Sequence, residues 1–360
     1  MANITFNANS GSKAATKNGK RSKSASSAKK KSRSGKKVQT EAVRYLRYEL
    51  TNSGSPGTET SHYIDLARDL SAINRRLMRQ GRAYHVKRIS VVSSNTIAAH
   101  NVADLTSFPG VTDFTQNAGR ITFATAPTSW VSKQAWKRGF KAWTEMQNRA
   151  MKASGLNPKP TWNDFKIYLS NEHRTSLTGQ KPKPKDNGGN DVALGEWDYA
   201  EFVSPDGTTG ADSMFVHLLG AHVGGAGSRT AIGLIQSYGD SRATVNNDSP
   251  TVKSAIDDDP IFNLFDDGTV FDEIVEDMRN KNDGCPYNLL TYPGDGVNQP
   301  KPMVVQQTTL GADGRASVGG FTAMCGLMEV EITSPIANDV YSVLVELAPG
   351  NYRGIAADVI

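Results

Sequence analysis

Cysteine is almost absent from this 360-residue sequence, in which only Cys285 and Cys325 occur. Neither belongs to a C-x-x-C pair, and two cysteines cannot supply the four ligands of a structural zinc site. We expect two buried thiols, with a disulfide between them as the open alternative. Long apolar runs are also missing, since no stretch approaches the roughly eighteen apolar residues of a membrane span. We therefore expect neither a membrane-spanning helix nor a secretory signal.

Signatures of catalysis are scarce. P-loop, H-E-x-x-H and G-x-S-x-G patterns do not occur, and the six histidines are scattered along the chain. Residues 225–230 (GAGSRT) approach a dinucleotide-binding fingerprint, but Thr230 stands where Gly or Ala is required. We interpret that stretch as a turn. The sequence favours a protein with no catalytic residues and no cofactor, and leaves open only a nucleophile and base that the fold itself brings together.

Acidic residues are missing from residues 1–40, which we call the arm. Its eleven basic residues are Lys13, Lys17, Lys20, Arg21, Lys23, Lys29, Lys30, Lys31, Arg33, Lys36 and Lys37. The rest of the chain holds the remaining thirty Lys and Arg against thirty-six Asp and Glu, so the arm carries +11 and the rest −6. Because the arm has almost no apolar side chains to bury, it is predicted to be disordered.

Three interpretations of the arm are open. The first is a solvated tail without a specific role, and the second is a nuclear-localisation signal at residues 29–33. The third is a segment that binds a polyanion by neutralising its phosphates. The last two are compatible with each other. The arm has no aromatic residue between Phe6 and Tyr45 on which a base could stack. The third interpretation therefore predicts binding of nucleic acid without regard to base sequence.

The residues after the arm alternate between strand and helix patterns. Residues 42–50 alternate apolar and polar side chains and predict a strand, which a Gly/Ser/Pro-rich loop follows at residues 52–60. Residues 62–80 predict a helix that ends at Gly81, because their leucines and isoleucine follow a spacing of four, three and four. Residues 83–92 and 120–124 predict two further strands.

Residues 130–153 carry the clearest helical pattern. Ser129 is a suitable N-cap and Gly155 a suitable end, while Trp136, Phe140 and Trp143 form an aromatic stripe that predicts a buried face. The polar side is basic, with Lys133, Lys137, Arg138, Lys141, Arg149 and Lys152. Two interpretations of this side are open: a solvated helix face, and a second contact for the polyanion that the arm binds.

The remaining chain is rich in short strand patterns separated by turn residues. The predicted strands are residues 162–169, 196–203, 213–219, 230–237, 303–310, 321–332 and 340–347, and a short acidic helix is predicted at residues 267–281. This spacing favours an antiparallel β-sandwich over a parallel α/β sheet. We predict a disordered arm (1–40), a shell-like β domain (41–348) with a surface loop near residues 180–190, and a C-terminal tail (349–360).

An acidic cluster at Asp257, Asp258 and Asp259 has the composition of a metal site. Dense carboxylates suit Ca²⁺, although their spacing is not that of an EF-hand loop. Two interpretations are open: a solvated acidic loop, and a Ca²⁺-binding or arginine-binding site between subunits in which one chain supplies part of the ligands. We therefore expect no cofactor apart from this weak Ca²⁺ candidate.

Several segments, taken in order, resemble one family. They are the arm, the first strand, the segment HYIDLARDLSAINRRL that begins at His62, the basic strand at residues 84–92, and TAPTSW (125–130) leading into KRGFKAWTEM (137–146). Together they resemble the capsid proteins of bacilladnaviruses, the single-stranded DNA viruses of diatoms. The resemblance is strongest over residues 40–170, and the remainder agrees in its β-rich character.

Bacilladnavirus capsid proteins are similar to the jelly-roll capsid proteins of nodavirus-like RNA viruses. The resemblance implies an eight-stranded jelly roll, icosahedral assembly with other copies of the chain, packaging of viral single-stranded DNA, no enzymatic activity and no membrane partner. It implies a place in the virion and, during assembly, in the host nucleus. Two other classes stay open: a cellular nucleoid or chromatin protein, which would share the arm, and a lectin-like or enzymatic jelly roll, which would share the body.

Overall fold

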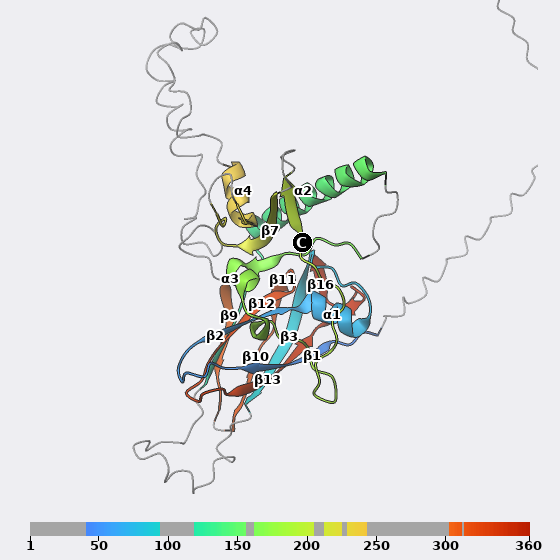
Figure 1. Ribbon diagram of the computed structural model, residues 1–360. Helices are drawn as coiled ribbons and strands as arrows, with labels where there is room; N and C mark the ends of the chain where they lie inside the picture. The colour runs from blue at the N-terminus through green and yellow to red at the C-terminus, as the bar shows by residue number, and fades with distance from the viewer. Residues whose placement is uncertain are drawn as a thin grey trace, which may run out of the picture. The chain divides into compact units, whose positions relative to one another are not determined.

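Figure 1 shows the computed structural model of the chain, which describes residues 41–93, 119–155, 162–204, 212–224, 229–242, 302–311 and 313–360. The chain divides into two units, Met1–Val38 and Gln39–Ile360, and every described residue belongs to the second. This second unit, which we call the body, is mainly β, and most of its strands pair antiparallel.

The first sheet is organised around its longest strand. Its members are β1 (Tyr45–Thr51), β13 (Val340–Leu347), β3 (Arg82–Ser93), β10 (Arg315–Val318), β11 (Phe321–Met324) and β16 (Ala357–Val359). β13 lies between β1 and β3, and β10, β11 and β16 all pair antiparallel with β3. The alternation predicted for residues 42–50 is confirmed in β1, where Leu46, Tyr48 and Leu50 are buried.

The second sheet has four strands, all antiparallel. Its order is β2 (Thr60–Asp65), β12 (Leu327–Thr333), β4 (Arg120–Thr125) and β9 (Met303–Thr309). One core cluster contains Tyr48 and Val343 from the first sheet together with Ile64, Phe123 and Val330 from the second. The two sheets therefore share a single apolar core, as expected for alternating strands that each bury one face.

A third sheet lies beside α2 and α4 in the upper part of Figure 1. It consists of β5 (Tyr168–Ser170), β7 (Asp212–Leu219), β6 (Glu201–Ser204) and β8 (Ala231–Gly233), and its helices are α2 (Trp130–Ser154), α3 (Asn171–Thr175) and α4 (Leu234–Arg242). β7 pairs parallel with β5 and β8. The predicted antiparallel pairing is therefore confirmed in the first two sheets, and the third sheet departs from it, because alternation indicates the face of a strand and not its direction.

The helix predicted at residues 62–80 is wrong at both ends. Residues 60–65 form β2, in which Tyr63 pairs with Glu329 of β12. α1 (Leu66–Asn74) begins only after Asp65, whose side chain accepts a hydrogen bond from the Arg68 amide, and it ends at Arg75 in the left-handed conformation (φ 51°). Strand pairing and the Asp65 cap outweigh the helical spacing of the apolar residues.

Gly81 has another role than the one predicted. A Cβ atom at this position would lie 2.6 Å from Cη2 of Trp136, so only glycine lets the chain pass this ring.

The helix that supplies the ring follows the prediction closely: α2 is capped by Ser129, which accepts from the Ser132 amide, and Gly155 follows it with φ 66°. The predicted strands at residues 83–92, 120–124, 213–219, 303–310 and 340–347 are likewise confirmed.

Other predicted boundaries need correction. In residues 162–169 and 196–203 only the short strands β5 and β6 form, and residues 230–237 form the short strand β8 and then begin α4. Residues 321–332 are split into β11 and β12 by a turn with Cys325 at φ 59°. The predicted tail at residues 349–360 is wrong. It forms β14 (Pro349–Gly350), β15 (Gly354–Ile355) and β16, and it buries Ile355 and Ile360. The polar stretch at residues 180–190 forms a loop that follows a short 3-10 helix, η3 (Thr178–Gln180).

The aromatic stripe of α2 gives the first prediction. Trp136 and Trp143 are buried and surround Phe165, whereas Phe140 is 36% exposed. Replacing Trp136 by Ala should lower the free energy of unfolding by about 3–5 kcal/mol, because the ring leaves a cavity against Phe165 and Gly81. Urea unfolding measures the loss. Trp162→Ala, at a 65% exposed position, is the control and should change stability little; equal losses in the two variants would contradict the burial of the stripe.

Candidate functional site

Apart from the basic side of α2, the site residues predicted from the sequence lie outside the described residues. This applies to the eleven basic residues of the arm, to Asp257, Asp258 and Asp259, to the predicted acidic helix at residues 267–281 and to Cys285. Cys325 is described and is a buried free thiol, whose pKa is raised by burial. Their roles therefore stay predictions, and the site that can be built from contacts lies in the body.

A buried carboxylate, Asp65, collects four hydrogen bonds. The residue is 1% exposed and stands at the junction of β2 and α1. Its Oδ1 accepts from the Arg68 amide at 3.0 Å, and its Oδ2 accepts from Gln80 Nε2 at 2.7 Å, Trp197 Nε1 at 2.9 Å and Tyr199 Oη at 3.3 Å. The donors come from three separate parts of the chain, so this carboxylate ties them together.

The network continues on both sides of Asp65. Asp69 accepts from Tyr48 Oη at 2.6 Å and from Arg68 Nε at 2.8 Å, which connects α1 to β1. Gln80 Oε1 accepts from the Ile167 amide at 2.7 Å, which connects the same network to the segment before β5. We call Tyr48, Asp65, Arg68, Asp69, Gln80, Trp197 and Tyr199 the Asp65 cluster. It joins the shared core of the first two sheets to the part of the body that carries the third.

The electrostatics of the cluster follow from its burial. Loss of water raises the pKa of Asp65, and it raises that of Asp69 to about 6, while the Arg68 guanidinium opposes both shifts. Each carboxylate is thus held by several donors and one nearby cation, as buried charges require. Because these oxygens already accept hydrogen bonds from the protein, the geometry indicates a structural role, in which the cluster holds separate segments of the chain together.

Three buried histidines carry no charge at neutral pH. Burial lowers the pKa of His62 and His217 to about 4 and that of His173 to about 3. His173 stacks on Tyr63 with ring centroids 5.1 Å apart, and its Nδ1 accepts from the Leu169 amide at 3.1 Å. Within the described ranges no three His, Cys, Asp or Glu side chains gather as a set of metal ligands.

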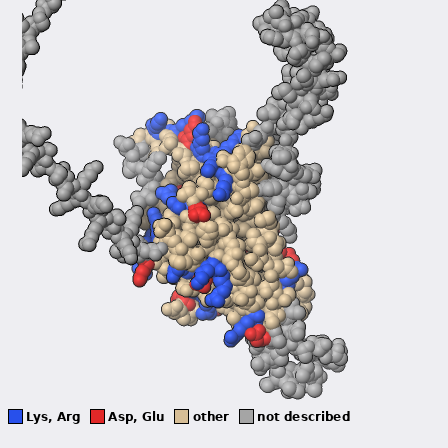
Figure 2. Space-filling model, turned by 180° about the vertical axis from the view of Figure 1, so that it is seen from behind, with Lys and Arg blue, Asp and Glu red and all other residues tan. Residues whose placement is uncertain are grey.

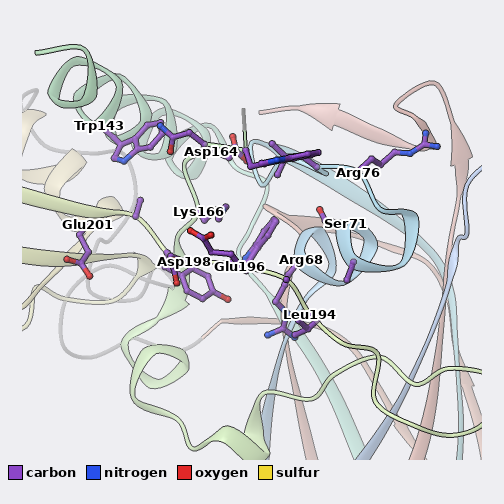
Figure 3. Close-up of a pocket in the computed structure, with 18 of the residues that line it drawn as sticks. Arg68, Ser71, Arg76, Trp143, Asp164, Lys166, Leu194, Glu196, Asp198 and Glu201 are labelled. Atoms are coloured by element: carbon purple, nitrogen blue, oxygen red, sulfur yellow. The ribbon is translucent and has the colours of Figure 1, made fainter. Parts of the chain in front are cut away.

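An open cleft of about 990 Å³ lies next to the Asp65 cluster (Figure 3). Its lining carries both signs of charge: Arg68 lies on α1 and Arg75 and Arg76 directly follow it, while Glu196 and Asp198 precede β6 and Glu201 begins that strand. Lys166 also lines the cleft, but its Nζ lies 4.7 Å from the Trp197 ring centre. Mixed charge of this kind gives the cleft no selective attraction for a polyanion.

A second buried carboxylate, Glu329, lies on the second sheet. It is 1% exposed, pairs with Tyr63 across β2, and faces away from the shared core to which Met328 and Val330 belong. Among the described residues neither carboxylate oxygen has a hydrogen-bond partner of normal geometry. Burial, together with the negative charges of Glu331 and Glu172, raises its pKa to about 7, and the Ser61 and Tyr63 hydroxyls oppose this shift.

Comparisons with known proteins identify no relative: no family model, no curated protein and no solved structure matches the chain. In the part of the chain that the structure describes, no helix is long and apolar enough to span a membrane.

The Asp65 cluster was not predicted from the sequence. Asp65 itself had a detectable signal as an N-cap candidate, but Gln80, Trp197 and Tyr199 lie too far along the chain for any spacing rule to connect them to it.

The substitution Asp65→Asn tests whether the Asp65 carboxylate holds these segments together. The substituted side chain keeps one carbonyl oxygen and places an amide group where the other carboxylate oxygen accepted, so at least one of the four donors to Asp65 loses its acceptor. Each buried donor left unpaired should cost about 1–3 kcal/mol in the free energy of unfolding. Urea unfolding measures this loss, and Asp198→Asn at the exposed edge of the cleft is the matched control. A variant as stable as the control would contradict the role of Asp65.

Glu329 makes stability depend on pH. Because its folded-state pKa of about 7 lies above the ordinary 4.5, its stabilising contribution is complete below about pH 4.5, declines as pH rises, and is lost above about pH 7. Glu329→Gln should therefore raise the free energy of unfolding at about pH 8 by at most about 3 kcal/mol, and change it little at about pH 4. Urea unfolding at both pH values tests this, with exposed Glu196→Gln as control. A gain of the same size at both would show that ionisation of Glu329 is not the cause.

Proposed function

We propose that the protein is a structural capsid protein that assembles with copies of itself into an icosahedral shell and packages single-stranded DNA through its arm. The observation that carries this proposal is the separation of charge along the chain. The arm holds eleven basic residues and no acidic residue, directly ahead of a mainly β body with a net charge of −6. A polyanion neutralises the arm, and the body is left to make contacts between subunits.

The order of the strands supports a jelly roll for the body. Counting β10 and β11 as one interrupted strand, and setting aside the short C-terminal strand β16, the two sheets that share a core have eight strands. In chain order the first strand pairs with the eighth, the second with the seventh, the third with the sixth and the fourth with the fifth. These are the pairs of one long hairpin, and the contacts of β13 with β3 and of β12 with β4 are those made when such a hairpin is rolled up.

The third sheet fits this proposal as an insertion. α2 and β5 to α4 occur in the chain between β4 and β9, the fourth and fifth strands of the rolled hairpin. An insertion at that point leaves all eight strands free to pair. We also propose that Asp257, Asp258 and Asp259 are the candidate ligands for Ca²⁺ at contacts between subunits. From the basic arm we infer that the protein is located in the virion and, during assembly, in the host nucleus.

Deletion of residues 13–37 tests the packaging role. Full-length subunits should bind single-stranded DNA and RNA with similar affinity, and log affinity should fall linearly with log salt, by about 0.7 for each phosphate contacted. The deleted protein should keep its thermal unfolding transition and lose most of this slope, as measured by fluorescence anisotropy in a salt titration. An unchanged slope after the deletion, or a preference for one base sequence that persists at high salt, would contradict the proposal.

A further inference from the structure

The exposed side of α2 concentrates positive charge in a body that is otherwise acidic. The helix has six basic residues and one acidic residue, Glu145, so it carries +5 while the body as a whole carries −6. Viewed along the axis, with 3.6 residues per turn, the six basic residues fall within an arc of about 160°. This basic face consists of Lys133, Lys137, Arg138, Lys141, Arg149 and Lys152. Lys and Arg gather at the upper end of the molecule in Figure 2, the end at which Figure 1 shows α2.

Most of these cations have no carboxylate to neutralise them. Arg149 pairs with Glu145 at 2.5 Å, and Arg138 donates to the Ser237 carbonyl. Among the described residues no ion pair involves Lys133, Lys137 or Lys141. These three lysines follow one another at intervals of four residues, which places them about 6 Å apart along the helix axis. They form a row of positive charges along one side of the helix.

The other side of α2 is committed to the core and cannot serve as a binding surface. Trp136 and Trp143 are buried, and at Gly139 the helix approaches so closely that a Cβ atom would lie 2.7 Å from Leu234. A helix that lies in a membrane needs an exposed apolar side to insert into the lipid. Because the larger part of the exposed surface of α2 is basic, the main contribution to contact with a partner is electrostatic.

One aromatic residue stands beside the row. Trp130, the first residue of α2, is 57% exposed, and its ring is oriented by an edge contact with Tyr238 at 5.8 Å between centroids. On the helical wheel it lies between Lys137 and Lys141. A partly exposed indole next to a row of cations is the combination with which proteins hold single-stranded nucleic acid, because bases stack on the ring while the backbone follows the charges.

We propose that the basic face of α2, together with Trp130, is a second binding site for single-stranded nucleic acid, located in the body. This inference rests on the proposed function and adds a contact that is separate from the arm. The site recognises the phosphate backbone through Lys133, Lys137 and Lys141 and stacks one base on Trp130. Through this site the body binds the packaged strand independently of the arm, and it does not distinguish between base sequences.

The test uses the full-length chain and an oligo-dT probe. The variant Lys133→Gln/Lys137→Gln/Lys141→Gln should reduce the slope of log affinity against log salt by about 2, since each lost phosphate contact removes about 0.7. The control Arg88→Gln/Lys183→Gln/Arg315→Gln removes the same charge from exposed positions elsewhere in the body and should leave the slope unchanged. Replacement of the three lysines by Arg should preserve it. Equal slopes for the α2 variant and the control would overturn the proposal.

Two further measurements separate this site from its alternatives. Trp130→Leu should weaken binding of oligo-dT about fivefold or more and leave binding of inorganic polyphosphate unchanged, because polyphosphate has no bases to stack. An equal effect on both would overturn the stacking role. If the triple Lys→Gln variant kept its DNA slope and lost binding to phosphatidylserine vesicles, the face would be a membrane contact and the proposal would be wrong. A wild-type chain that binds no nucleic acid at all would instead refute the proposed function itself.

Discussion

Burial of the Asp65 carboxylate is the constraint on which the arrangement of the body depends. A charged group at 1% exposure is tolerated only if protein donors replace its water, and four donors do so here. One is the amide that starts α1, one is Gln80 in the turn ahead of β3, and two belong to the segment that leads into β6. With Asp69 and Tyr48 the same network reaches β1. Folding of the third sheet and of the two-sheet core is thereby coupled through one set of hydrogen bonds.

The distribution of charged residues along the chain is not needed to form the hydrophobic core. The core needs only the alternation of apolar residues in the two large sheets and the aromatic stripe of α2. The basic side of α2 lies outside that core, and both it and the acid-free arm concentrate cations in a chain whose remainder is acidic. Positive charge that folding does not use is available for a polyanion, and this is the physical basis of both proposals.

Local patterns in the sequence predicted the elements that local forces determine. α2 was predicted with both ends because Ser129, Gly155 and the aromatic stripe give consistent signals, and β1, β3 and β13 were predicted because each buries alternate residues. β2 was missed because Leu66 and Leu70 belong to a helical spacing that begins within the next few residues. β14 to β16 have two or three residues each, too few for alternation to be visible. The Asp65 cluster and the parallel pairs of β7 depend on contacts between distant segments, which no local pattern encodes.

Electron microscopy of the purified full-length protein tests the central claim most directly. If the basic arm and the mainly β body belong to a capsid protein, negative-stain images should show closed shells of uniform diameter, and the shells should contain nuclease-protected nucleic acid. The arm-deleted protein should form empty shells or none. Full-length protein that stays monomeric or forms irregular aggregates in the presence of single-stranded DNA, while its body remains folded, would contradict the account.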